Sequence, residues 1–277
     1  MLTRLREGTP NAAREGRTDR PRPDASGATV AIEGVGHSFG ELRAIQRIDL
    51  EAEPGEVVGI VGPSGCGKTT LIELVAGLRQ ADSGTISVGG RAEAAERLER
   101  CAYMPQRDLL LPWLSAVDNA SLALRVAGVA RQAARAQAGE HFDRLGLAGF
   151  EQARPDELSG GMRQRVAFLR TLMAGRPVLL LDEPFASLDA ITRAEMQQWL
   201  AAVLHSDRHT VLLVTHDVEE ALYLSDRVLV LGSRPASVAE RVEVSGPRAA
   251  DRDAAVTSPE FTELRQRALR SLAEAAR

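Results

Sequence analysis

Five short, uninterrupted apolar runs place the strongest limit on how this chain of 277 residues can fold. A strand with one wet face alternates apolar and polar residues, whereas a strand covered on both faces is apolar throughout. Helical patterns separate the runs along the chain. We therefore predict a mostly parallel sheet between helices, with the chemistry in the loops. The five runs are Val57–Val61, Cys101–Met104, Val178–Leu181, Val211–Val214 and Val228–Leu231.

The composition excludes several classes of protein. Hydrophobic residues make up 44% of the chain, enough for a sizeable core, and the formal net charge of −4 lacks the basic excess typical of nucleic-acid-binding proteins. No stretch approaches the roughly 20 consecutive apolar residues of a membrane-spanning helix, and the first residues lack the apolar segment of a signal peptide. We predict a cytoplasmic protein without a nucleic-acid partner, in which Cys66 and Cys101 are reduced thiols.

Three segments lie outside the alternation of strands and helices. Residues 1–27 mix Arg with Gly, Pro, Asp and Ser, which predicts a disordered tail. Residues from about 107 to 170 are rich in Ala, Leu, Arg and Gln, and predict a helical insertion whose first helix is capped by Ser115. Residues 233–277 form a C-terminal extension, in which Thr257-Ser258-Pro259-Glu260 predicts the start of a packed terminal helix.

A glycine-rich segment directly follows the first apolar run and precedes a helical pattern. It matches G-x-x-x-x-G-K-[ST], a motif that binds nucleotide phosphates when it joins a strand to a helix. The glycines let backbone N–H groups point at phosphate oxygens, the lysine reaches the β- and γ-phosphates, and the threonine hydroxyl ligates Mg²⁺. An ordinary glycine-rich turn is the alternative. The segment consists of Gly62, Pro63, Ser64, Gly65, Cys66, Gly67, Lys68 and Thr69, and we add the following Thr70.

Two carboxylates follow the apolar run at Val178–Leu181. Asp182 and Glu183 thus sit at the carboxyl-terminal tip of a predicted buried strand. An aspartate in this position can hold Mg²⁺, and the next carboxylate can reach the γ-phosphate and act as the general base that polarises the attacking water. The alternative is a pair of solvated acids at a strand end, which the phosphate-binding motif disfavours.

A second serine-glycine turn opens a predicted helix at Leu158-Ser159-Gly160-Gly161-Met162-Arg163-Gln164. Its N-terminus is again suited to phosphate, although one nucleotide does not need two such cradles on the same side. The segment resembles the signature motif of ABC transporter ATPases, a family in which it occurs together with the phosphate-binding motif and the acidic strand.

The resemblance covers about residues 28–232 and includes the family's other motifs in their usual order. Gln106 resembles the Q-loop glutamine, Ser187-Leu188-Asp189 resembles the D-loop, His216 resembles the switch histidine, and Phe39 stands where the family places an aromatic residue that stacks on adenine. The fold that this resemblance implies is an α/β, RecA-like P-loop NTPase core with an antiparallel β subdomain and an inserted helical subdomain.

ATP and Mg²⁺ are the cofactors that the resemblance implies. Lys68 and Mg²⁺ would offset the phosphate charge, Glu183 would activate water, and His216 would sense or stabilise the γ-phosphate. Two subunits would pack head to tail as an ATP-bound homodimer, so that Ser159-Gly160-Gly161 of one subunit covers the ATP bound by the other. The implied metal ligands are Thr69, Gln106 and Asp182.

A narrower resemblance lies in Leu110-Leu111-Pro112-Trp113, which is similar to bacterial importers of the nitrate/sulfonate/taurine family, including carriers of pyrimidine precursors of thiamine. It implies integral membrane permease subunits, an indirect link to a solute-binding protein, and a peripheral position on the inner face of the cell membrane. Pro105 departs from the Phe that is usual there. We expect Leu109–Trp113 to form an exposed apolar groove for a short permease helix, with core packing as the alternative.

Two other functions stay open. A soluble ABC ATPase acting on nucleic acid or ribosomes usually carries two ATPase halves or a long coiled coil, whereas this chain has one motif set and no sustained heptads. A binding-only module would not need the intact Lys68, Asp182, Glu183 and His216. For Cys66, the neighbouring lysine and the helix N-terminus predict a favoured thiolate.

Overall fold

The computed structural model describes residues 27–186, 188–206, 208–244 and 251–275. Of the predicted tail, residues 1–26 lie outside this range. Gly27 does not belong to a tail, because a Cβ atom on it would come within 2.3 Å of the Gly55 nitrogen and 2.7 Å of the Thr210 hydroxyl. It packs against the folded domain.

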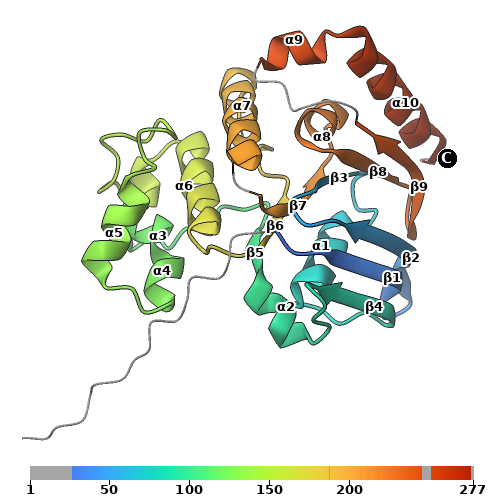
Figure 1. Cartoon of the computed structure of the whole chain (residues 1–277), viewed down its shortest axis with the longest axis horizontal. Helices are drawn as coiled ribbons and strands as arrows, with labels where there is room; N and C mark the ends of the chain where they lie inside the picture. Colours follow the sequence, from blue (N-terminus) through green and yellow to red (C-terminus); the bar gives the residue numbers. More distant parts are fainter. Residues whose placement is uncertain (1–26, 187, 207, 245–250, 276–277) are drawn as a thin grey trace, which may run out of the picture.

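A mixed sheet of nine strands forms the centre of the described chain (Figure 1). The strands are β1 (Val30–Phe39), β2 (Leu42–Ala52), β3 (Val57–Val61), β4 (Ser83–Val88), β5 (Cys101–Met104), β6 (Val178–Asp182), β7 (Thr210–Thr215), β8 (Arg227–Leu231) and β9 (Ala236–Glu243). Their order is β4-β1-β2-β9-β8-β3-β7-β6-β5. The segment β8-β3-β7-β6-β5 is parallel, as the apolar runs predict, whereas β2-β1-β4 is antiparallel.

Strand β9 joins the two parts of the sheet. It pairs antiparallel with β8 and parallel with β2. A domain boundary at residue 232 therefore does not coincide with a break in the structure, because the C-terminal extension supplies a strand in the middle of the sheet. The sequence signal for β9 is weak, because only Ala236 and Val242 of its 8 residues are buried, which gives neither an apolar run nor a regular alternation.

Helices cover both faces of the parallel strands (Figure 1). They are α1 (Lys68–Ala76), α2 (Ala94–Arg100), α3 (Ala116–Ala120), α4 (Leu122–Val126), α5 (Arg131–Gly139), the 3-10 turn η1 (Pro155–Glu157), α6 (Gly160–Leu172), α7 (Ala190–Ser206), α8 (Val218–Leu224), α9 (Arg252–Val256) and α10 (Pro259–Ala275). Helices α3 to α6 form a lobe beside the sheet. The predicted cap of α3 is confirmed, because Ser115 Oγ accepts the N–H of Asp118. No described helix is long and apolar enough to span a membrane.

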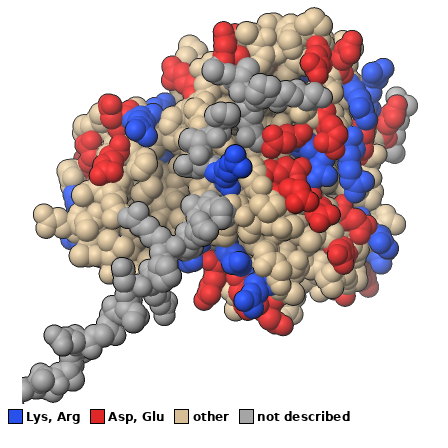
Figure 2. All heavy atoms as spheres, in the orientation of Figure 1, with Lys and Arg blue, Asp and Glu red and all other residues tan. Residues whose placement is uncertain are grey.

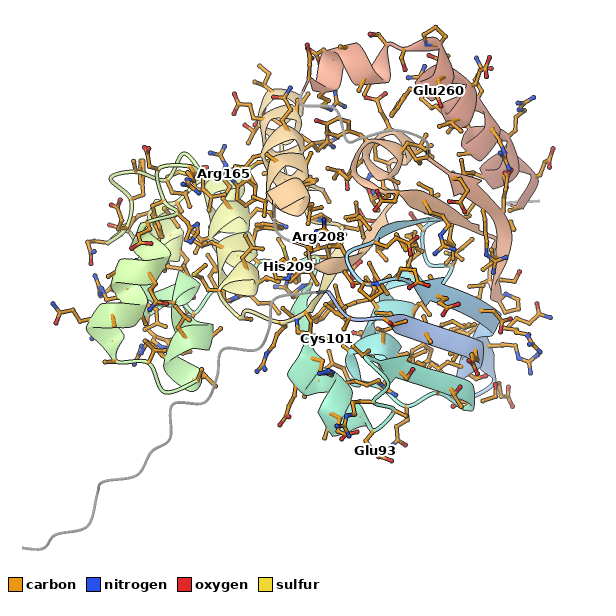
Figure 3. The ribbon with its side chains drawn as sticks, viewed as in Figure 1. Glu93, Cys101, Arg165, Arg208, His209 and Glu260 are labelled. Atoms are coloured by element: carbon orange, nitrogen blue, oxygen red, sulfur yellow. The ribbon has the colours of Figure 1, made fainter. Side chains whose placement is uncertain are left out.

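Alternate residues of the parallel strands enter two separate cores. In β3, Val57 and Val61 face the core that contains Phe168, whereas Val58 and Ile60 face the core beneath α1. Burying one such aliphatic side chain contributes about 1.5–3 kcal/mol. Figure 3 shows the side chains on both faces of the sheet and labels Cys101, which lies in the core beneath α1. Burial raises the pKa of the Cys101 thiol to about 12. Both cysteines are free thiols, as predicted.

The C-terminal helices pack on α7, α8 and the neighbouring strands. Helix α10 starts at the predicted signal, where Ser258 Oγ accepts the N–H of Phe261. In α9, the Arg252 guanidinium donates to Gln197 of α7 at 2.7 Å and to Glu219 of α8 at 2.6 Å. These contacts fix the C-terminal segment to the two helices that flank β7.

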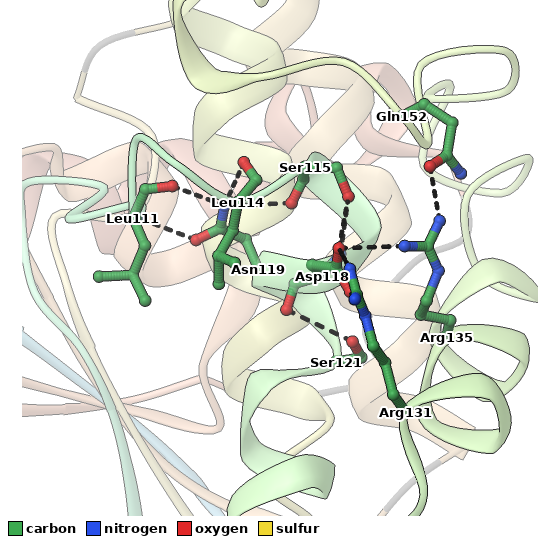
Figure 4. A network of polar contacts seen from close by, with 9 residues as sticks. All are labelled: Leu111, Leu114, Ser115, Asp118, Asn119, Ser121, Arg131, Arg135 and Gln152. Carbon is green, nitrogen blue, oxygen red and sulfur yellow. Dashed lines mark hydrogen bonds and ion pairs between the residues drawn. The ribbon is translucent and has the colours of Figure 1, made fainter.

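The loop of residues 108–114, between β5 and α3, is held at its second end by one buried amide (Figure 4). Asn119 is fully buried, and its Oδ1 accepts the N–H of Leu111 at 2.8 Å. Its Nδ2 donates to the carbonyls of Leu111 and Leu114 at 3.1 and 3.2 Å. The amide thus provides hydrogen-bond partners for loop backbone groups that have none in a helix or a sheet.

Asp118, beside this clamp, ties α3 to α5 (Figure 4). Its carboxylate is nearly buried and accepts hydrogen bonds from Arg131 at 2.8 Å and Arg135 at 3.0 Å. The hydrogen bond from Arg131 is the largest cause that lowers the pKa of Asp118, so the group is ionised in spite of its burial.

The first end of the loop is held by α6. Arg170 donates to the carbonyls of Asp108 and Leu109 at 2.6 and 2.8 Å, and Arg163 pairs with the Asp108 carboxylate at 3.2 Å. Leu109 has a φ of +44°, which is unusual for a residue with a Cβ atom. The two arginines hold this backbone conformation in place.

Replacing Asn119 with Ala should lower the free energy of unfolding by about 2–4 kcal/mol, because it leaves the N–H of Leu111 and several carbonyls without partners. Urea denaturation followed by circular dichroism measures the change. The exposed Gln198, replaced by Ala, is the control and should change stability by less than about 0.5 kcal/mol. Equal stability of the two variants would contradict the clamp.

Candidate functional site

A cavity of about 360 Å³ lies where the carboxyl ends of β3, β5 and β6 meet the turn between β1 and β2. Most of its lining was expected from the motifs, and Leu42, Ala44 and Arg234 are additions. The lining residues are Phe39, Leu42, Ala44, Ser64, Gly65, Gly67, Lys68, Thr69, Thr70, Gln106, Glu183 and Arg234. Parallel strands bring their carboxyl ends to one edge of the sheet, so residues far apart in sequence meet there.

The segment Gly62–Thr69 joins β3 to α1. Helix α1 has Gly67 at its N-cap and no side-chain cap, so its first N–H groups are available to an anion. Gly67 has a φ of +121°, and a Cβ atom on it would lie 3.1 Å from the Ala44 carbonyl. Lys68 is buried, and its Nζ donates to the carbonyls of Gly62 and Pro63 at 2.8 and 3.0 Å.

The expectation of a favoured thiolate at Cys66 is wrong. The side chain is buried, and a Cβ atom on Gly62 would lie 2.9 Å from its sulfur. Burial raises the pKa of Cys66 and outweighs the opposite effect of Lys68. Sequence reasoning considered the nearby charge but could not see that the thiol points into the core rather than toward the cavity.

Asp182 ends β6 and is almost fully buried. Its Oδ1 has no hydrogen-bond partner within the described residues. Burial raises the pKa of Asp182, while a hydrogen bond with the Thr69 side chain lowers it. An orphaned carboxylate oxygen beside a hydroxyl fits a Mg²⁺ ion, which prefers oxygen ligands and needs only one or two from the protein when phosphates and water supply the rest.

In the part of the chain that the structure describes, no group of three or more His, Cys, Asp or Glu side chains is arranged to hold a metal ion by itself. The described residues therefore do not form a metal site in which the protein supplies every ligand. Gln106, the third expected ligand, is exposed and lines the cavity, whereas Asp182 lies behind its wall.

Glu183 occupies a strained backbone position at the cavity wall. Its φ is +50°, although it is not glycine, and its N–H donates to the Val214 carbonyl of β7 at 2.8 Å. The carboxylate forms a hydrogen-bonded pair with Nδ1 of His216, the residue that follows β7. Strain of this kind concentrates at functional sites. The pair joins the ends of two neighbouring strands.

Phe39 forms the apolar end of the cavity. The residue is 43% exposed, which leaves surface for a flat apolar ligand. His37 packs edge-on at 4.8 Å between ring centroids, and the Arg79 guanidinium lies over the ring at 5.1 Å. These contacts hold the ring in place, and Leu42 and Ala44 extend the apolar wall.

Ser159, Gly160 and Gly161 do not line this cavity. They open α6 in the helical lobe, on the other side of the parallel strands from α1 (Figure 1), and Ser159 Oγ accepts the N–H of Met162. Gln164 of the same helix donates to the Pro184 carbonyl at 2.9 Å, directly after Glu183. Within one subunit, the phosphate-binding loop Gly62–Thr69 and the N-terminus of α6 are therefore separate sites.

The expected D-loop lies between β6 and α7. Ser187 is outside the described residues, and Leu188 is buried. The Asp189 carboxylate accepts the N–H groups of Ile191 and Thr192, both at 3.1 Å, and thereby caps α7. These hydrogen bonds lower the pKa of Asp189.

The sheet order and the phosphate-binding loop define a P-loop nucleoside-triphosphate-binding protein of the α/β class. The ABC transporter family model matches residues 45–186. An aliphatic sulfonates import ATP-binding protein of Rhodococcus jostii is 47% identical over 218 residues, covering 78% of this chain and 84% of the relative. The chain belongs to the ABC transporter family, and it is an ATP-binding subunit that hydrolyses ATP.

Other relatives agree with this assignment. A formylaminopyrimidine import ATP-binding protein of Halalkalibacterium halodurans is 45% identical over 191 residues, 69% of this chain and 74% of that protein. A nitrate import ATP-binding protein of Synechococcus elongatus is 40% identical over 242 residues, 85% of this chain and 88% of that protein. A solved dimeric ATP-binding cassette in a post-hydrolysis state, bound to ADP and Pi, has a TM-score of 0.71 at 27% identity and covers 78% of this chain and 99% of its own.

Glu220 is a buried acid that sequence reasoning missed. It lies on α8, which follows His216 in the chain, and Gln197 donates to its Oε2 at 3.2 Å. Its Oε1 has no partner within the described residues. Burial raises the pKa of Glu220 to about 8, so the group is largely protonated at neutral pH. The available signal was its position one helical turn before the buried Leu224.

Glu220 should make the protein less stable as pH rises from about 5 to 8. The unfolded chain loses this proton near pH 4.5, the usual pKa of a glutamate, whereas the folded chain keeps it until about 8, so deprotonation favours unfolding in that window. Glu220→Gln should remove this part of the pH dependence. Urea unfolding at several pH values measures the slope, with the exposed Glu263→Gln as control. A slope unchanged in Glu220→Gln would contradict the assignment.

Proposed function

We propose that this chain is the ATP-hydrolysing subunit of an importer, which couples MgATP binding and hydrolysis to the passage of a small solute through separate permease subunits. The observation that carries the proposal is the convergence of Lys68, Thr69, Gln106 and Glu183 on one cavity. The importer class is supported by the relatives, which are named for the import of sulfonates, nitrate and formylaminopyrimidine. The solute here would belong to the same range, as nitrate or sulfonate-like anions or a pyrimidine precursor of thiamine.

Residues that line the cavity or lie next to it have distinct chemical roles in this proposal. Lys68 and the N–H groups of α1 bind the phosphates, Phe39 stacks on the adenine, and Glu183 polarises the attacking water. His216 orients the Glu183 carboxylate and contacts the γ-phosphate. Thr69, Asp182 and Gln106 would hold Mg²⁺, which when bound supplies positive charge to the phosphate oxygens.

A second copy of the chain would complete the site. Ser159-Gly160-Gly161 lies outside the cavity of its own subunit, while a helix N-terminus of this kind suits a phosphate. The solved relative that is bound to ADP and Pi is dimeric. We therefore propose a head-to-tail homodimer in the ATP-bound state, at the inner face of a membrane that holds the permease and, beyond it, a solute-binding protein.

A function on nucleic acid is not supported. On the face that Figure 2 shows, acidic and basic side chains of the described residues are interspersed rather than gathered into a basic surface. The overall charge of −4 likewise lacks the basic excess of a nucleic-acid-binding protein.

Glu183→Gln should keep MgATP binding and lower hydrolysis by about 10²–10⁴-fold, because the amide keeps the shape of the side chain but cannot take a proton. The ATP-bound dimer should then accumulate. Phosphate release and light scattering after gel filtration measure the two effects. Glu195→Gln, the same change at an exposed position of α7, is the control. Hydrolysis at the wild-type rate by a monomeric Glu183→Gln would refute the role.

The loop of residues 108–114 is the proposed docking loop for the permease. The expected groove is revised in one respect, because Leu110 is buried in the core rather than exposed. Leu109 and Trp113 are 55% and 69% exposed and present apolar surface just after Gln106. Because Asn119 and Arg170 hold the loop at both ends, a force applied to it would be passed to α3 and α6 rather than absorbed.

Leu109→Ser together with Trp113→Ser should weaken association with the permease subunits by about thirtyfold, since an apolar anchor at an interface is commonly worth 2 kcal/mol or more. Soluble ATPase activity and melting temperature should stay close to wild type. Co-purification with the co-expressed permease measures association. Val126→Ser, at the most exposed apolar position of α4, is the matched control. Full co-purification of the double variant would place the contact elsewhere.

A further inference from the structure

One cation in the nucleotide cavity belongs to none of the motifs found in the sequence. Arg234 lies in the turn between β8 and β9, 169 residues from Gly65, and both residues line the cavity. Its guanidinium donates twice to the Gly65 carbonyl, from Nε at 3.0 Å and from Nη2 at 2.6 Å. The side chain therefore reaches the phosphate-binding loop from a different part of the sheet.

The contact fixes the orientation of one peptide group in that loop. Gly65 has a φ of +72°, a conformation that favours glycine. Because a peptide group is planar and trans, holding the Gly65 oxygen on one side directs the N–H of Cys66 to the other, where it donates to the Pro63 carbonyl at 3.2 Å. Arg234 thus stabilises the turn of the phosphate-binding loop at Gly65.

The Arg234 guanidinium also has a donor that the contact with Gly65 does not use. Its Nη1 makes no hydrogen bond within the described ranges, and the side chain is exposed rather than buried. The charged residues that line the cavity in the described chain are Lys68, Arg234 and Glu183. Lys68 already donates to two carbonyls of the loop, which leaves one of its three N–H groups for phosphate oxygens in this conformation. Arginine is permanently charged and suits phosphate oxygens.

We propose that Arg234 is a second phosphate-binding cation of this site, which holds Gly65 through one edge of the guanidinium and binds the phosphate chain of the nucleotide through Nη1. The inference rests on the proposed function, since it assigns a further residue to the same nucleotide site. It adds a contact from the turn between β8 and β9 to those made by the loop and α1.

The test compares MgATP and MgADP binding by calorimetry in wild type, Arg234→Ala and Arg234→Lys. Arg234→Ala should weaken both nucleotides by about 10- to 100-fold, because a hydrogen bond to a charged group is lost together with a cation. Arg234→Lys keeps the charge and should recover part of the affinity. Its affinity should also fall with added salt as in wild type, more steeply than that of Arg234→Ala.

Arg241→Ala is the matched control. Arg241 is an exposed arginine of β9 that also donates to a backbone carbonyl, that of Asp49 at 2.8 Å, but it does not line the cavity. Its replacement should leave nucleotide affinity unchanged.

Two results would overturn the inference. One is an Arg234→Ala affinity within twofold of wild type. The other is equal weakening in Arg234→Lys and Arg234→Ala, which would show that the shape of the guanidinium supports the loop without its charge binding phosphate. Failure of the proposed function would look different, because wild type would then not bind MgATP, or Lys68→Ala would bind it as well as wild type.

Discussion

The burial of the parallel strands on both faces is the constraint from which the rest of this structure follows. Each strand sends alternate residues into two cores, as Val57 and Val58 do in β3, so a change of register would exchange the two sets and disrupt the packing of both cores. The carboxyl ends of β3, β5, β6 and β7 therefore meet at one edge. The phosphate-binding loop, Gln106, Asp182, Glu183 and His216 all lie at those ends.

That rigid edge makes an electrostatically demanding site possible. Lys68 is buried among loop carbonyls, Asp182 keeps an oxygen without a partner in the described chain, and Glu183 has a positive φ. Each feature costs free energy in the absence of ligand, and the two cores on either side offset it. A bound MgATP would supply partners for polar groups that lack them in the free protein. The binding free energy would therefore come in part from these groups.

The helical lobe is joined to this edge by polar contacts with backbone carbonyls rather than by a shared core alone. Arg170 of α6 holds Asp108 and Leu109, Gln164 of the same helix holds Pro184, and Asn119 closes the far side of the loop. One helix therefore contacts both the segment after Gln106 and the segment after Glu183. These directional bonds fix the lobe to the edge of the sheet where the nucleotide-binding residues lie.

The order of residues was enough to predict the parallel strands, the phosphate-binding loop and the family motifs, because those depend on local patterns of apolar and glycine residues. The folded chain was needed to show that β9 completes the sheet, that Cys66 and Leu110 point into the core, that Glu220 is buried and largely protonated at neutral pH, and that Arg234 reaches Gly65. Burial, and contacts between residues distant in sequence, decide these properties, and neither leaves a periodic trace in the chain.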